Sequence, residues 1–201
     1  MQQPAKLNYK VYQGSTFQET YRWESQTKVY VPITAISKAA PCVITTSTNS
    51  NIPVGWRFRV TGVQGMKEIN HTDTDSYYLA TGVSSTEVTI NQINSTLYTT
   101  YTSGGILEYN QPVDLTVYSA RMQIRETVDS TSIIYEATSA NGQIVLDKVT
   151  NKTITINIPA STTQTFTFDT AVYSMELFDG ATGIVVPFLV GNLTLVKEIT
   201  R

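Results

Sequence analysis

The chain has 201 residues and a formal net charge of −2 at pH 7; 41% of its residues are hydrophobic and 15% are charged. The charged fraction is low against about 25% in ordinary globular proteins. Much of the polarity comes instead from Ser and Thr, and β-branched Thr suits a half-exposed pleated sheet. These features favour an all-β protein with hydroxyl groups on its outer faces. No basic stripe stands out, so binding of nucleic acid through its phosphates is not expected.

The start of the chain and its cysteine content bear on where the protein is made. Residues 1–10 (MQQPAKLNYK) contain no apolar core of a signal peptide, so we expect no secretory signal. No apolar run reaches the roughly 18 residues of a membrane-spanning helix, and no membrane association is expected. Cys42 is the single cysteine, which excludes a disulfide within the chain. This composition is compatible with assembly in a reducing cytoplasm.

Alternation of apolar and polar residues recurs along the chain and predicts short strands. In chain order the clearest segments are Trp56–Val60, Glu87–Ile90, Tyr118–Arg125, Thr153–Ile158, Tyr173–Phe178 and Leu193–Leu195. In the first of these, Arg57 and Arg59 alternate with apolar residues as they would on the outer face of a strand. Only single helical turns are expected, near Gln64–Ile69 and Ser161–Thr165. Many short strands at about 8–12-residue spacing suggest a sandwich or a barrel.

Turn residues between the apolar runs predict hairpins. Asp179–Gly183 separates two apolar runs and has the composition of a tight hairpin turn. Asn141 and Gly142 separate Ile133–Ala137 from Ile144–Leu146 and give a second hairpin signal.

The run Val185–Leu189 is nearly all apolar and predicts a strand buried on both sides, but Pro187 interrupts it. Proline has no N–H to donate to a neighbouring strand. The strand therefore either contains a bulge or lies at an edge, where another chain could pair with it.

The chain is expected to contain two modules, one inserted in the other. Residues 1–28 and 110–201 would form an antiparallel β-sandwich. Residues 29–109, which contain Ser- and Thr-rich loops and a strand set of their own, would form a small inserted β-barrel. The division rests on resemblance to two known families.

The outer segments resemble the N-terminal domain of phage baseplate upper proteins and related small phage virion proteins. The resemblance is carried by QGSTF at 13–17, YRW at 21–23, QPVDLT at 111–116, YSARMQIR at 118–125, VYSMEL at 172–177, GNLTL at 191–195 and EITR at 198–201. Val117 stands where these proteins usually have Gly, so the turn there is expected to differ.

The inserted block resembles the small β-barrel named for the first catalytic-cysteine half-domain of ubiquitin-activating enzymes, a module that recurs in phage structural proteins. The matching segments are ISKAAPCVITT at 36–46, VTGVQGMKEIN at 60–70, YYLA at 77–80 and YTTYTSGG at 98–105. The catalytic cysteine of that name belongs to the enzyme and not to the barrel. Cys42 is therefore not expected to act as a nucleophile.

Residues for catalysis or metal binding are sparse. His71 is the only histidine and falls in a polar stretch, where we expect a solvated loop residue. With one Cys and one His, the chain can supply at most two of the four ligands of a Cys/His zinc site, and no recognised spacing supports a catalytic role for His71. Asp73 and Asp75 resemble the start of a calcium loop, but the required Gly and Glu are missing, so a turn is expected. We expect no enzyme, no cofactor and no metal site.

The resemblances imply a structural component of a tailed-phage particle, assembled in the host cytoplasm and located in the virion. It would contact other virion proteins as a homo-oligomer or ring, as a tail, baseplate or neck adaptor, with capsid decoration as an alternative. A second alternative is a carbohydrate-binding module facing the host surface, which needs a groove lined with exposed aromatic residues. The residues expected to line it, or to touch a partner, are Trp56, Tyr77, Tyr98 and Tyr101.

Overall fold

The computed structural model describes residues 3–199 and contains almost only strands and loops, which confirms the all-β prediction. The 3₁₀ turn η1 (Lys67–Ile69) and the short helix α1 (Ala160–Thr163) lie where single helical turns were predicted. Within residues 3–199, no helix is long and apolar enough to cross a membrane. The last two residues of the EITR segment at 198–201 lie outside the described part of the chain.

The chain divides into two compact units. The first contains the residues up to Tyr21, Asp114–Lys148 and the residues from Thr153 onward. The second contains Arg22–Val113 and the short loop Val149–Lys152. The insertion boundaries expected at 28/29 and 109/110 are displaced by a few residues. Strand β4 (Glu24–Ile36) crosses the first boundary and strand β10 (Ser103–Pro112) crosses the second, and the two strands remain paired as far as Glu24 and Pro112.

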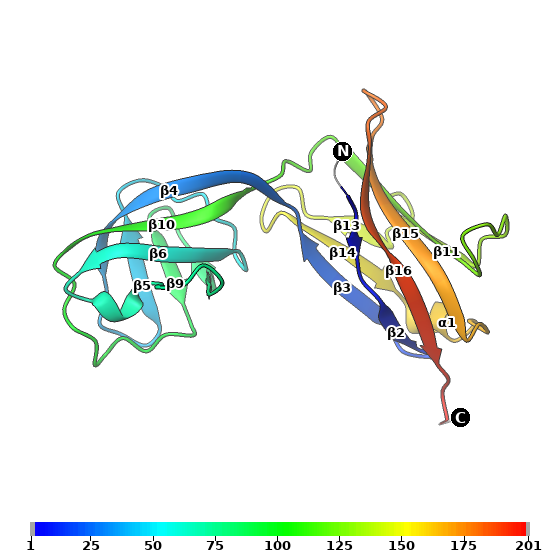
Figure 1. Ribbon diagram of the computed structural model, residues 1–201, viewed down its shortest axis with the longest axis horizontal. Helices are drawn as coiled ribbons and strands as arrows, with labels where there is room; N and C mark the ends of the chain where they lie inside the picture. Colours follow the sequence, from blue (N-terminus) through cyan, green and yellow to red (C-terminus); the bar gives the residue numbers. More distant parts are fainter. Residues whose placement is uncertain (1–2, 200–201) are drawn as a thin grey trace. The chain divides into compact units, whose positions relative to one another are not determined.

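The larger sheet of the first unit has six strands (Figure 1). They are β1 (Ala5–Lys6), β2 (Tyr9–Tyr12), β11 (Tyr118–Arg125), β12 (Tyr135–Thr138), β15 (Thr170–Asp179) and β16 (Val185–Val196). Their order is β1-β16-β15-β11-β12, and β2 follows β1 along the same edge of β16. The central pairs are antiparallel as expected, whereas β1 and β2 run parallel to β16.

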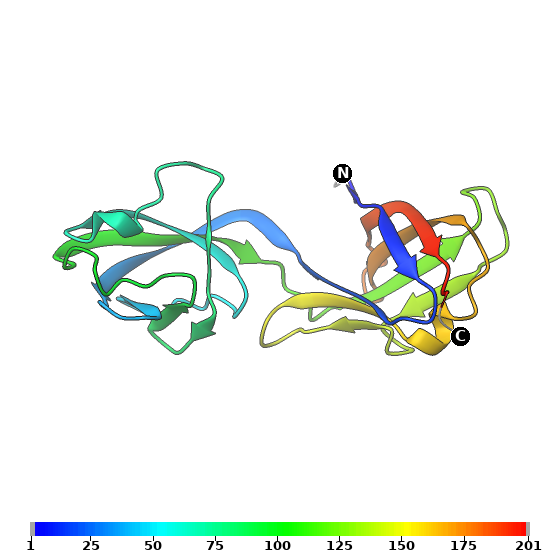
Figure 2. The ribbon, with the colours of Figure 1, turned by 90° about the horizontal axis from the view of Figure 1, so that it is seen from below.

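A three-stranded sheet forms the other layer of this unit, with the order β13-β14-β3 (Figure 2). Its strands are β3 (Phe17–Arg22), β13 (Ile144–Leu146) and β14 (Thr153–Ile158). Alternate residues of both sheets are buried, as period two requires. The buried set includes Ala120, Met122, Ile124, Ile144, Ile154, Ile156, Ile158, Tyr173, Met175, Leu177, Leu189 and Leu193. The first unit is therefore a β-sandwich.

The N-terminal strand of the six-stranded sheet is interrupted where it passes Gly191. A Cβ atom on Gly191 would lie 1.7 Å from the Leu7 carbonyl oxygen, so only glycine fits at this position. The Leu7 N–H donates to Val190 O (2.9 Å), its carbonyl accepts from the Tyr173 hydroxyl (3.0 Å), and the Asn8 side chain accepts from the Asn192 N–H (2.9 Å). These bonds fix the break between β1 and β2.

The hairpin predicted at Asp179–Gly183 is confirmed, since the Asp179 N–H donates to Ile184 O (2.9 Å) between β15 and β16. Both readings of Pro187 hold: among the described residues Val185–Pro187 pair only with β15, because β1 begins opposite Leu189, and a bulge lies there as well. The expected burial on both sides is wrong, since Val185 is 53% exposed. The β15–β16 register shifts between Met175 and Glu176, opposite Leu189 and Pro187.

The hairpin predicted at Asn141 and Gly142 is wrong, because β12 and β13 belong to different sheets. The Asn141 side chain accepts hydrogen bonds from the N–H groups of Thr138 (2.9 Å) and Gln143 (3.1 Å). These bonds form a turn that carries the chain from one layer of the sandwich to the other.

The second unit is a single seven-stranded sheet that curls into a half-barrel, with the order β7-β6-β10-β4-β5-β9-β8. Besides β4 and β10, its strands are β5 (Cys42–Thr46), β6 (Arg57–Gln64), β7 (Tyr78–Leu79), β8 (Gly82–Val83) and β9 (Glu87–Ile90). The concave side encloses a core that includes Ile44, Trp56, Phe58, Met66, Ile69, Ile90 and Leu107.

Candidate functional site

The tryptophan expected to line an open groove is instead part of the core. Trp56 is fully buried, and its indole N–H donates to Asn110 O (2.8 Å). The prediction is wrong at this residue, because the strand places Trp56 on the same side as Phe58 and Val60 while Arg57 and Arg59 face outward.

The three predicted tyrosines do not form an open aromatic platform either. Tyr98 and Tyr101 are half-buried against the core of the second unit, and the Tyr101 hydroxyl lies 3.0 Å from both Ile33 O and Gly104 O. Tyr77 is 41% exposed, but the Arg57 guanidinium lies over its ring at 4.8 Å. The carbohydrate-binding alternative thereby loses the aromatic surface on which it depended.

His71 is not the solvated loop residue that was expected. It is half-buried, and its Nδ1 accepts a hydrogen bond from the Val60 N–H (3.1 Å). Its ring contacts the ring of Tyr78 with centroids 4.2 Å apart. Burial and the nearby Arg59 lower the pKa of His71, with burial the larger cause. The polar residues around His71 in the sequence did not indicate that its imidazole forms a hydrogen bond with β6.

Cys42 and the two aspartates have structural surroundings. Burial raises the pKa of the Cys42 thiol, whose side chain is fully enclosed. Asp73 Oδ1 accepts from the N–H groups of Asp75 (2.9 Å) and Ser76 (2.7 Å), which confirms the predicted turn. Among residues 3–199 there is no group of three or more Cys, His, Asp and Glu side chains suited to a metal ion.

Three cations of the second unit, Lys28, Arg57 and Arg59, are bound within that unit, whereas Lys38 and Lys67 are exposed and take part in none of the ion pairs found among residues 3–199. Glu24 receives two hydrogen bonds from Arg57 Nε (2.8 and 2.9 Å) and one from Arg57 Nη2 (2.8 Å). Lys28 forms an ion pair with Glu108, and Arg59 donates to the carbonyl of Asp73. These pairs border a small hollow of about 160 Å³, in which the positive and negative side chains of the lining neutralise one another.

The two outer faces of the sandwich differ in chemistry. On the three-stranded sheet the outward positions are mainly hydroxyl and amide residues, with a Thr20–Thr155 hydrogen bond of 3.0 Å across β3 and β14. We call this the hydroxyl face; it comprises Gln18, Thr20, Thr153, Thr155 and Asn157, with Val145 at its edge. It matches the outer surface predicted from the Thr-rich composition.

The outward side of β15 and β16, two central strands of the six-stranded sheet, carries apolar residues interspersed with Ser174, Glu176, Asn192 and Thr194. We call this the valine face; it comprises Val172, Phe178, Val185, Pro187 and Val190, none of them fully buried. Solvent-facing strand positions normally carry polar side chains. These apolar residues make the face a candidate contact surface.

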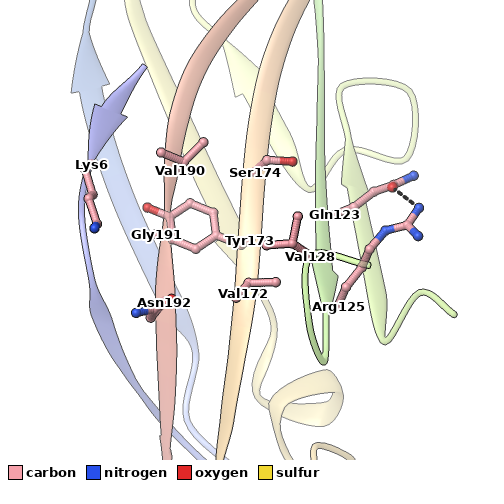
Figure 3. A pocket seen from close by; sticks show the side chains of 10 residues that line it. All are labelled: Lys6, Gln123, Arg125, Val128, Val172, Tyr173, Ser174, Val190, Gly191 and Asn192. Atoms are coloured by element: carbon pink, nitrogen blue, oxygen red, sulfur yellow. Dashed lines mark hydrogen bonds between the residues drawn. The ribbon is translucent and has the colours of Figure 1, made fainter. Parts of the chain in front are cut away.

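A half-open hollow of about 390 Å³ lies on the valine face (Figure 3). Val172 and Val190 line its floor, and Val128 reaches over it from the loop between β11 and β12. Figure 3 shows Lys6 on one side of the hollow and Arg125 on the other.

Both cations of the hollow lack a carboxylate partner. Within residues 3–199, no Asp or Glu oxygen lies within 4.0 Å of the Lys6 or Arg125 side chain. Arg125 donates to Gln123 Oε1 (2.8 Å) and to Ser130 O (2.5 Å), both uncharged. The hollow can therefore accept a group that combines an aliphatic side chain with a carboxylate.

The chain was also compared with known proteins. A scan against protein-family models finds no match, and a search of the curated proteins finds no relative. The resemblance to phage proteins therefore stays an inference from the quoted segments.

Sequence reasoning did not single out the residues of the hollow. Val172 and Phe178 occupy polar positions of an alternating run, and this departure from the pattern was the available signal. Lys6 and Arg125 are 119 positions apart along the chain, and only the parallel pairing of β1 with β16 brings them to one sheet face.

Proposed function

We propose that this protein is a non-enzymatic structural component of a tailed-phage particle. It acts as a tail, baseplate or neck adaptor through symmetric contacts with other virion proteins. The segment resemblances described above support this role, as does the organisation into a sandwich and a curled β-sheet unit.

The observation that carries the proposal is the valine face with its hollow. An adaptor needs a surface that is stable alone but complementary to a neighbour, and a sheet face with half-buried and exposed valines beside cations that lack carboxylate partners has these properties. The hydroxyl face of the same sandwich offers no comparable apolar surface. The contrast between the faces is what an assembly component requires.

Quantitative mass spectrometry of purified particles tests the proposal. We expect the protein in intact particles, in a copy number that matches a tail, baseplate or neck ring. A copy number in proportion to the major capsid protein would instead assign it to capsid decoration. Absence from intact particles would overturn the structural role.

A further inference from the structure

The loop that borders the hollow has the chemistry that the hollow accepts. It connects β11 to β12 and contains Glu126, Thr127, Val128 and Asp129. The Val128 side chain is 83% exposed, and both flanking carboxylates are exposed. The loop is held in a turn by a hydrogen bond from the Ser130 N–H to Thr127 O (3.2 Å). It therefore presents an aliphatic group between two negative charges.

The charges of the loop lack partners, as do those of the hollow. Within residues 3–199, no Lys, Arg or His nitrogen lies within 4.0 Å of the Glu126 or Asp129 carboxylate. The hollow with its two cations and the loop with its two carboxylates thus adjoin one another, since Val128 of the loop also lines the hollow. Such a surface is complementary to itself.

We propose that two copies of the chain associate through their valine faces, with the loop 126–129 of each copy entering the hollow of the other. Val128 would contact Val172 and Val190 of the second copy. The loop carboxylates would lie against Lys6 and Arg125 of that copy. The proposal deepens the assembly role and rests on it for its biological setting.

The placement of loop and hollow favours a two-fold contact over an open chain of copies. Both halves of the contact lie at the same hollow, because Val128 of the loop lines it, so both are satisfied at once only when the two hollows face each other. A head-to-tail contact would leave one loop and one hollow of each pair unused. The arrangement therefore predicts a closed dimer.

Light scattering combined with size-exclusion chromatography measures the mass of the purified chain across concentrations. The expected result is a shift from the monomer mass of 22.2 kDa to twice that value as concentration rises. A mass that stays monomeric up to about 1 mM, the weak end of specific association, would overturn the dimer. That outcome would leave the particle analysis unaffected, so the two proposals fail separately.

Charge reversal identifies the surfaces involved. A hollow variant (Lys6→Glu with Arg125→Glu) and a loop variant (Glu126→Lys with Asp129→Lys) should each lose dimerisation, because like charges then meet twice in each dimer. Mixing the two variants should restore a dimer containing one copy of each, because every loop then faces a hollow of opposite charge. A mixture that stays monomeric would contradict the proposed contact.

Two further variants separate the contact from general effects of charge and folding. Thr155→Glu adds a charge to the hydroxyl face and should leave the dimer unchanged. Val128→Ser removes only the aliphatic side chain of an exposed loop residue and adds no charge, and it should weaken dimerisation at least 10-fold. Circular dichroism would verify that both variants remain folded. Loss of the dimer in the Thr155 variant, or an unchanged dimer in the Val128 variant, would contradict the assignment.

Discussion

Two groups of surface charges, one in each unit, differ in whether they have carboxylate partners within the chain. In the second unit, Arg57 is held by Glu24 through three hydrogen bonds and Lys28 pairs with Glu108. In the first unit, Lys6 and Arg125 border an apolar hollow without a carboxylate within 4.0 Å among the described residues. A charge that forms an ion pair within its own unit contributes to the stability of that unit. A charge without a carboxylate partner, beside apolar side chains, is available to another molecule.

This difference suggests that the two units contribute differently to folding and to association. The curled sheet of the second unit satisfies its outward arginines internally, buries Trp56 and covers the ring of Tyr77 with Arg57. The sandwich of the first unit has one face of hydroxyl and amide residues and one face on which valines lie among charged and polar residues. Changes in the second unit should therefore act on folding, whereas changes on the valine face should act on association.

The largest effect is expected for Gly191→Ala in the first unit. The added methyl would overlap the Leu7 carbonyl oxygen, so β1 and β2 could not keep their places against β16. We expect the first unit to lose about 3 kcal/mol or more of its free energy of unfolding, the upper range for overpacking. Urea denaturation followed by tyrosine fluorescence would measure the loss. Gly180→Ala is a matched control, because a Cβ there meets nothing within 4 Å, and equal losses would contradict the account.

A smaller loss is expected for Glu24→Gln in the second unit. The Glu24 side chain is 12% exposed and accepts hydrogen bonds from both Arg57 and Asn110. Replacement by a neutral amide leaves Arg57 without its counter-charge, and we expect a loss of about 2 kcal/mol, typical of hydrogen bonds to charged groups. Denaturation of Glu87→Gln gives the control, since Glu87 is exposed on the same unit. A Glu24 variant as stable as that control would show that the charge pairing does not stabilise the unit.

The extent to which the sequence predicted this structure depends on the range of the interactions. Alternation correctly indicated β14, with Ile154, Ile156 and Ile158 on its buried side, because the two faces of one strand are a local property. The turn at Asp179–Gly183 was likewise local. Asn141 and Gly142 have the same local composition, but they connect two layers, and no local pattern distinguishes a hairpin from such a crossing.

The candidate site was predicted poorly because it depends on strand pairing. The positions of Lys6, Arg125 and Val190 on one face follow from the register of β1, β16, β15 and β11. A side chain's partners across a sheet depend on register, and composition does not specify it. The burial of Trp56, by contrast, could have been read from its alternation with Arg57, and the aromatic hypothesis overlooked that signal.

A pH effect on the second unit should be smaller still. In the folded unit the pKa of His71 lies below its ordinary value of 6.5, so the folded state binds fewer protons than the unfolded state once the pH falls below about 6.5. Protonation also removes the Nδ1 lone pair that accepts the Val60 N–H. Stability from this group is therefore fully present above pH 6.5 and is lost as the pH falls through the folded pKa. The slope should not exceed about 1.4 kcal/mol per pH unit, the limit for one proton.

Denaturation midpoints of the wild type and of His71→Asn between pH 8 and pH 4.5 would measure this contribution. The difference between the two proteins should be constant above pH 7 and shrink below pH 6.5, because the variant cannot titrate there. A constant difference over the whole range would show that His71 does not respond to pH, and that its contact with β6 is steric alone.

The smallest effect is expected on the valine face itself, at the ion pair between Arg121 and Glu176. Their side chains are 50% and 31% exposed, so solvent screens the attraction, and such pairs couple by less than about 1 kcal/mol. A double-mutant cycle with Arg121→Ala and Glu176→Ala, measured by urea denaturation, gives the coupling directly. Arg121 also lies over the Phe178 ring at 5.9 Å, and the cycle separates that contact from the ion pair. A coupling free energy as large as the loss of unfolding free energy in Glu24→Gln would mean that the ion pair on this face stabilises its unit as much as the Glu24–Arg57 pair does. The contrast between the units would then not hold.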